Sequence, residues 1–255
     1  MAAVTSFSMK VKILNIAVDK TSKKAVVDRV RVFLEEKRKF LLVTPNPEIA
    51  LLAYKDVKLA EIINSADIAI ADGVGFKLAS PSLAIIKGRE LMLDLFGLAD
   101  RLKLKIYLLG AADSVNKLAV KLVIKKYANV KVLGASGPKL DFFSVPTNGE
   151  EKKIEEAIVS EINKFRPDIL FVAFGAPKQE LWAAGWLPKL KVGGAMAVGG
   201  AFDYFAGNAK VPKIIEKLGL EWLFRLINEP RRLGRMFNAV VVFPLMLLKH
   251  KFFRA

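Results

Sequence analysis

The segment EEKKIEEAIVSEINKFRPDILFVAFGAPKQE, residues 150–180, decides the fold class. Residues 150–165 are predicted to form a helix, and residues 168–174 are the most continuously apolar of the strand-like segments. A strand that is apolar on both faces has to be covered on both sides, which is typical of a parallel sheet packed between helices. The glycine and proline after the strand lead into a second helix. The segment therefore predicts one unit of a parallel α/β sheet.

The same alternation continues in both directions along the chain. Further strands are predicted at residues 11–16, 40–44, 67–71, 104–110, 130–133 and 192–198, and helices at residues 21–37, 47–64 (two short ones), 90–102 and 114–127. Strands separated by helices indicate an α/β, Rossmann-like fold with a mostly parallel sheet and helices on both faces. In such folds ligands bind at the carboxyl ends of the strands, close to helix N-termini.

Composition excludes several classes of chemistry. The chain of 255 residues is 53% hydrophobic, has no cysteine and has a single histidine, His250, near its end. Disulfide frameworks, thiolate nucleophiles, histidine-rich metal sites and a Ser-His-Asp triad are therefore excluded. The first residues have no signal-peptide pattern, and no apolar run reaches the length of a spanning helix. A cytoplasmic protein without a metal centre or organic cofactor is expected.

The formal net charge of +16 indicates an anionic partner such as lipid, nucleic acid or a polyphosphate-bearing substrate. Part of this charge lies after the α/β core of residues 1–207. Residues 210–255 contain ten lysine or arginine residues, three glutamates and the apolar run 239–248. We therefore expect residues 208–255 to form a helical, basic appendage that lies on an anionic membrane surface. The alternative is an ordinary C-terminal helix packed on the core.

Two polar motifs follow predicted strands in the first third of the chain. Residues 43–48 (Val-Thr-Pro-Asn-Pro-Glu) place Thr44 and Asn46 where substrates bind in this architecture, although Asn46 before a proline also suits a helix cap. Residues 72–75 (Asp-Gly-Val-Gly) place Asp72 next to Gly73. A carboxylate there could act as a general base or accept hydrogen bonds from sugar hydroxyls. Capping a helix is the alternative.

Two further motifs follow strands in the second half. Residues 174–180 bring Lys178 and Gln179 to a helix start, a position that favours a phosphate. Residues 199–203 (Gly-Gly-Ala-Phe-Asp) indicate close approach of the backbone to a ligand or to another strand. The chain contains no Asp-x-Asp sequence, so the usual carboxylate clamp for a divalent cation on a nucleotide diphosphate is missing.

The appendage offers cations that could neutralise a diphosphate in place of a metal ion. Arg225, Arg232 and Arg235 stand seven and three residues apart, roughly on one helical face if Pro230 only kinks the path. Guanidinium groups arranged in this way suit a diphosphate. A solvated basic face is the alternative.

Taken together, the motifs resemble the WecG/TagA/CpsF family of bacterial glycosyltransferases (glycosyltransferase family 26), most closely its TagA branch. The resemblance rests on residues 44–48, 71–75, 88–92, 108–110, 175–180, 198–203 and 218–222 and on the three arginines. It implies an inverting, metal-independent transfer of N-acetylmannosamine from UDP-N-acetylmannosamine to N-acetylglucosamine on undecaprenyl diphosphate, a step in building the wall teichoic acid linkage unit. It also implies attachment to the inner face of the cell membrane.

The resemblance assigns roles to individual residues. Asp72 would be the general base on the acceptor hydroxyl, Thr44 and Asn46 would contact the sugar or acceptor, and Gln179 would lie in the donor pocket. The three arginines would meet the diphosphate once the appendage folds onto the core.

The sequence departs from the family pattern between residues 80 and 90. Residues 80–87 are shortened, Ile85 stands where the family has an arginine, and Glu90 stands where it has an aspartate. Lys87 or Arg89 is a candidate replacement for the lost cation. UDP-N-acetylmannosaminuronic acid or UDP-glucose as donor therefore stays open, as does a non-catalytic, membrane-recruited nucleotide-binding protein. A nucleic-acid partner is not expected, because the cations are spread along the chain. Self-association is left open.

Overall fold

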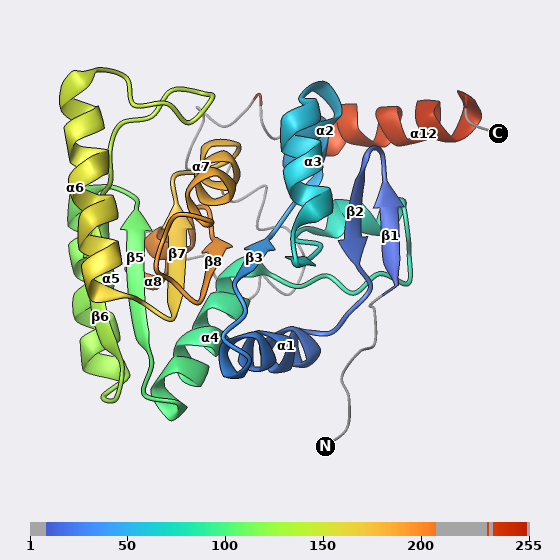
Figure 1. Ribbon diagram of the computed structural model, residues 1–255. Coiled ribbons are helices and arrows are strands. Elements are labelled where there is room, and N and C mark those ends of the chain that lie inside the picture. The colour runs from blue at the N-terminus through green and yellow to red at the C-terminus, as the bar shows by residue number, and fades with distance from the viewer. Residues whose placement is uncertain (1–8, 208–233, 235–236, 254–255) are drawn as a thin grey trace.

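The computed structural model describes residues 9–207, 234 and 237–253 (Figure 1). A central sheet of six strands has the order β4-β3-β8-β7-β5-β6. Its strands are β3 (Phe40–Val43), β4 (Ile68–Ala69), β5 (Lys105–Gly110), β6 (Lys131–Ala135), β7 (Ile169–Ala173) and β8 (Gly194–Ala197). Neighbouring strands pair in parallel throughout. The predicted parallel sheet is confirmed, and each predicted strand end falls within a few residues of the observed one.

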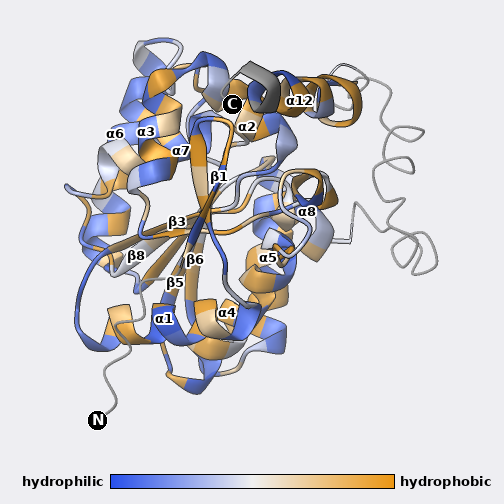
Figure 2. Ribbon diagram, turned by 90° about the vertical axis from the view of Figure 1, so that its right-hand side faces the viewer, coloured by the Kyte–Doolittle hydropathy of each residue, from blue (hydrophilic) through white to orange (hydrophobic). Residues whose placement is uncertain are grey.

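Helices cover both faces of this sheet, and the strand side chains alternate between two separate cores. Leu170 and Val172 of β7 belong to one core, and Ile169 and Phe171 to the other. The first core is covered by α2 (Pro47–Lys55), α3 (Val57–Ser65), α6 (Gly149–Phe165) and α7 (Lys178–Trp186). The second is covered by α1 (Lys23–Glu35), α4 (Gly88–Arg101), α5 (Asp113–Lys126) and α8 (Ala201–Phe205). Figure 2 shows the apolar strands enclosed between these layers.

The N-terminal strand prediction was wrong in one respect. Residues 11–16 do not form one strand of the main sheet, because β1 (Lys10–Ile13) and β2 (Ile16–Asp19) form a separate antiparallel hairpin. The chain reverses at Leu14, which has a φ of 56°, and at Asn15. The turn contains no glycine. It is fixed instead by the side-chain amide of Asn15, which donates to the Ala53 carbonyl at 2.6 Å. The hairpin joins the main sheet through Asp19, whose carboxylate accepts a hydrogen bond from the Ala69 N–H at 2.8 Å.

The C-terminal helices η3 (Asn238–Val242) and α12 (Phe243–Phe253) pack on the core with one side. Phe243 is fully buried, and its ring centroid lies 5.7 Å from that of Phe76 in η1 (Val74–Leu78). The opposite side of α12 exposes Leu245 and Leu248. The described part of the appendage is thus helical, as predicted, and uses one face to pack on the core. Within the described ranges, no helix is long and apolar enough to cross a membrane.

Candidate active site

The loops after β3 and β4 meet at the carboxyl edge of the sheet. These loops hold four of the predicted site residues, Thr44, Asn46, Asp72 and Gly73. The Asp72 N–H donates to the Pro45 carbonyl at 2.9 Å, which ties one loop to the other. Gly73 has a φ of 119°, and a Cβ built on it would lie 3.2 Å from the Pro47 ring. A Cβ at position 73 would therefore press on the Pro47 ring, and the positive φ favours glycine there.

The N-terminus of α4 completes this corner. The backbone N–H of Gly88 donates to Oδ2 of Asp72 at 3.1 Å. A Cβ built on Gly88 would lie 3.1 Å from that oxygen and 3.2 Å from Cγ2 of Thr44, so α4 begins in direct contact with both predicted residues. The N-terminal N–H groups of a helix favour a negative charge, and here the Gly88 N–H binds this carboxylate. Asp72 does not cap η1, the helix that follows it, because η1 has no side-chain cap.

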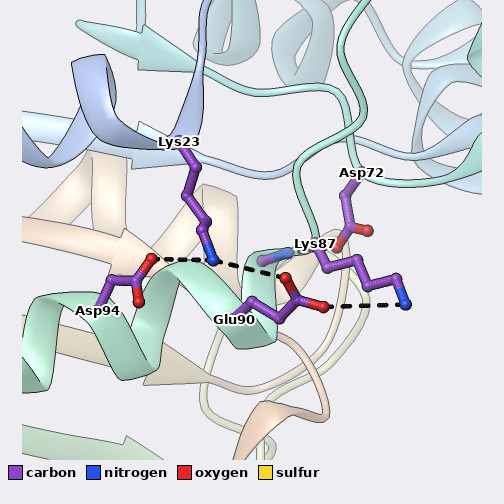
Figure 3. A network of polar contacts seen from close by, with 6 residues as sticks. Lys23, Asp72, Lys87, Glu90 and Asp94 are labelled. Atoms are coloured by element: carbon purple, nitrogen blue, oxygen red, sulfur yellow. Dashed lines mark hydrogen bonds and ion pairs between the residues drawn. The ribbon is translucent and has the colours of Figure 1, made fainter. Parts of the chain in front are cut away.

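An ion network lies beside Asp72 on the outer side of α4 (Figure 3). Lys23 of α1 is 3.1 Å from Asp94 and 3.5 Å from Glu90, and Lys87 is 3.8 Å from Glu90. The hydrogen bond to Asp94 is the main cause of a raised pKa of Lys23. These side chains are about 40% exposed, so each pair contributes no more than about 1 kcal/mol. The network therefore contributes little to the stability of the fold.

The cations next to Gly88 have distinct surroundings. Figure 3 shows Lys87 beside Asp72, and Arg89 lies over the Tyr204 ring of α8, 4.5 Å from its centroid. Arg89 also lines a hollow of about 760 Å³ between α4, α5 and α8, together with Lys125 and Lys126. Both candidate replacements for the missing arginine thus lie at the start of α4. Whether either of them meets the substrate stays a prediction.

Gln179, the second residue of α7, joins the start of this helix to the loop after β8. Its side chain is 2% exposed, and its Oε1 accepts a hydrogen bond from the Gly199 N–H at 2.9 Å. Thr44 connects the same edge from the other side, because its hydroxyl donates to the Ala197 carbonyl of β8 at 3.3 Å. The carboxyl ends of four adjacent strands, β4, β3, β8 and β7, are therefore linked by short polar contacts.

Lys178 points toward a different part of the molecule. Its Nζ donates to the Leu140 carbonyl at 2.5 Å, in the loop between β6 and α6. Gln179 and Lys178 thus both have protein partners in this structure, and their expected contacts with the donor stay predictions.

Asn46 is confirmed as a helix cap. Its Oδ1 accepts a hydrogen bond from the Ile49 N–H at 2.9 Å, and Pro47 is the first residue of α2. A cap and a substrate contact are compatible, since the side-chain Nδ2 is not used by the cap. Arg225, Arg232 and Arg235 lie outside the described residues. In residues 9–207 and 237–250, no three histidine, cysteine or acidic side chains are grouped so that they could hold a metal ion.

Glu180 is the residue of this region that the sequence reading missed. It is 1% exposed, its Oε1 accepts a hydrogen bond from Nε2 of Gln179 at 2.8 Å, and burial raises its pKa to about 7. The available signal was the apolar run at residues 181–184, which indicates that α7 is buried on more than one side. An acidic side chain next to that run is therefore expected to be buried and to lose its hydration.

Comparison with known proteins agrees with this architecture. The model of the "Glycosyl transferase WecG/TagA/CpsF family" matches residues 11–255. Curated relatives named N-acetylglucosaminyldiphosphoundecaprenol N-acetyl-beta-D-mannosaminyltransferase, from Staphylococcus aureus strains MRSA252 and MW2, are each 30% identical over 254 residues. The match covers 96% of this chain and 95% of each relative. The chain is therefore a glycosyltransferase and belongs to the WecG/TagA/CpsF family.

Proposed function

We propose that the protein transfers N-acetylmannosamine from UDP-N-acetylmannosamine to N-acetylglucosamine on undecaprenyl diphosphate, with inversion and without a metal ion. The names of the relatives support this sugar and this acceptor. The observation that carries the proposal is the carboxylate of Asp72, held by the Gly88 N–H where the loops after β3 and β4 meet.

In this proposal Asp72 accepts the proton of the acceptor hydroxyl. The hydroxyl oxygen forms a bond to the anomeric carbon of the donor while the bond from that carbon to the UDP oxygen breaks. A single displacement of this kind inverts the anomeric configuration and releases UDP. Thr44 and Asn46 lie next to Asp72, where they would contact the sugar or acceptor.

The leaving diphosphate needs positive charge, since the chain lacks an Asp-x-Asp clamp for a divalent cation. We assign this role to Arg225, Arg232 and Arg235, with Lys87 and Arg89 at the start of α4 as further candidates. Lys178, Gln179 and Gly73 are assigned to substrate binding at the same edge of the sheet. The protein would work at the inner face of the cell membrane, attached by residues 208–255, because its acceptor is a lipid.

A donor panel tests the proposal. UDP-N-acetylmannosamine, UDP-N-acetylmannosaminuronic acid and UDP-glucose are each offered with a short-chain lipid diphosphate N-acetylglucosamine acceptor, with and without EDTA. We expect transfer from UDP-N-acetylmannosamine alone, at the same rate with EDTA. Transfer from another donor would correct the sugar, and loss of transfer with EDTA would show a metal requirement. UDP binding without any transfer would favour the non-catalytic alternative.

A further inference from the structure

Three large apolar side chains are exposed together on one short loop. The aromatic loop, as we call residues 141–145 between β6 and α6, exposes Phe142 by 48%, Phe143 by 68% and Val145 by 55%. The two phenyl rings contact each other edge to face, with centroids 5.5 Å apart. Single exposed apolar residues are common, but three in a loop of five indicate a surface that is covered by a partner.

This exposure is built into the loop by its own hydrogen bonds. Oδ1 of Asp141 accepts from the N–H groups of Phe143 at 2.9 Å and Val145 at 2.8 Å. The hydroxyl of Ser144 donates to the Lys178 carbonyl at 3.0 Å, and Nζ of Lys178 returns a bond to the Leu140 carbonyl. The loop is thus fastened to the start of α7, and its apolar side chains are held outward.

The surroundings of the loop are cationic and aromatic. Phe143 lines a hollow of about 280 Å³ together with Trp186, Lys58 and Lys189. Nζ of Lys189 lies 5.4 Å from the centroid of the Trp186 ring. Val57, next to Lys58 at the start of α3, is 70% exposed. Apolar tips flanked by lysine and tryptophan are typical of proteins that lie in the interface of an anionic bilayer.

The position of the loop agrees with such a partner. In Figure 1 the segment between β6 and α6 reaches the same upper end of the molecule as α12. The outer side of α12 also exposes two apolar side chains, Leu245 and Leu248. The strands also point their carboxyl ends, where Asp72 lies, toward this end of the molecule.

We propose that the aromatic loop, with Val57, Lys58, Trp186 and Lys189, is a membrane-contact surface for anionic lipid, separate from the C-terminal appendage. Two contacts at one end of the protein fix its orientation on the bilayer as well as its attachment. This inference rests on the proposed function, because a lipid-linked acceptor is what requires the active site to face the bilayer in a defined orientation.

Vesicle binding of the full-length protein tests the surface. Wild type and the double variant Phe142→Ser/Phe143→Ser are sedimented with vesicles of phosphatidylcholine, with or without phosphatidylglycerol. The control is Leu118→Ser/Ile124→Ser, which removes two exposed apolar side chains from α5. We expect the loop variant to bind anionic vesicles about tenfold less tightly than wild type, and the control to bind like wild type.

A charge variant separates the two parts of the surface. Lys58→Ser/Lys189→Ser should weaken binding to anionic vesicles by about thirtyfold and leave binding to neutral vesicles unchanged, since it removes two cations that contribute about 1 kcal/mol each. Equal vesicle binding by wild type and the loop variant would overturn the proposal. A loop variant that loses self-association in sedimentation, with unchanged vesicle binding, would also overturn it and would identify a second copy as the partner.

Transfer to a short-chain, water-soluble acceptor distinguishes this proposal from the proposed function. The loop variant should transfer at the wild-type rate to that acceptor, which also shows that it folds, and more slowly to acceptor embedded in vesicles. If wild type itself transfers to neither acceptor, the proposed function fails. If both proteins transfer equally to both acceptors, only the membrane surface fails.

Discussion

The buried carboxyl group of Glu180 makes the stability of the fold depend on pH. Its Oε1 accepts one hydrogen bond from Gln179, and Oε2 has no hydrogen-bond partner in the part of the chain that the structure describes. Loss of hydration is the main cause of its raised pKa, and the hydrogen bond from Gln179 offsets only part of it. The folded protein therefore holds this proton more tightly than the unfolded chain does.

Proton linkage gives the direction in which stability changes with pH. Below the ordinary pKa of 4.5 the carboxyl is protonated in both states, so its burial costs no ionisation energy. Between 4.5 and about 7 the folded state binds more protons than the unfolded state, so stability falls as pH rises. One pKa unit corresponds to about 1.4 kcal/mol, so a pKa raised from 4.5 to about 7 costs about 3 kcal/mol at higher pH.

Glu180→Gln removes this cost, because the amide has nearly the same shape, carries no charge and still accepts from Gln179. Urea unfolding of wild type and variant is compared at about pH 5 and about pH 8, and the difference between the two proteins should shift by about 2–3 kcal/mol in favour of the variant at the higher pH. Glu156→Gln, at an exposed position of α6, is the matched control and should show no such shift. A difference between wild type and Glu180→Gln that is the same at both pH values would refute the reasoning.

Substitutions at three further positions test the arrangement around Asp72. Gly88→Ala introduces a Cβ that would lie 3.1 Å from Oδ2 of Asp72. Transfer should therefore fall by about tenfold or more while the unfolding free energy changes little. Normal turnover would show that this contact does not position the carboxylate. Asn46→Ala should lower the unfolding free energy by about 1 kcal/mol, and Asn46→Asp should restore it, because aspartate also caps a helix; a cap role is wrong if both variants lose the same stability. Lys23→Met should change the unfolding free energy by less than about 1 kcal/mol, since the ion pairs of Lys23 are exposed. A larger loss of unfolding free energy in a denaturant titration would show that the network has a larger structural role.

Much of the fold could be predicted because the strands of the sheet are apolar on both faces. Residues 168–174 have only one favourable environment, between two layers of helices, and the same holds for residues 104–110. The hairpin of β1 and β2 could not be predicted in the same way. Its turn contains Leu14 and Asn15 instead of glycine or proline, and the bond that fixes it reaches Ala53, far along the chain.

The candidate site was predictable where motifs follow strands, and less so where it depends on contacts between loops. Parallel strands bring their carboxyl ends to one edge, so Thr44 and Asp72 were each predicted at the edge of the sheet where ligands bind. The hydrogen bond from the Gly88 N–H to Asp72 could not be predicted, because it depends on how residues 80–87 bring α4 to the site. The burial of Glu180 likewise depends on the packing of α7 against distant elements.

The most direct test of the account is the activity of Asp72→Asn. The asparagine side chain keeps an oxygen for the Gly88 N–H but cannot take the acceptor proton. Transfer from UDP-N-acetylmannosamine to the short-chain acceptor should fall by about a hundredfold or more, while UDP binding by calorimetry and the unfolding curve stay close to those of wild type. Near-normal transfer by Asp72→Asn would contradict the assignment of Asp72 as the general base and the mechanism built on it.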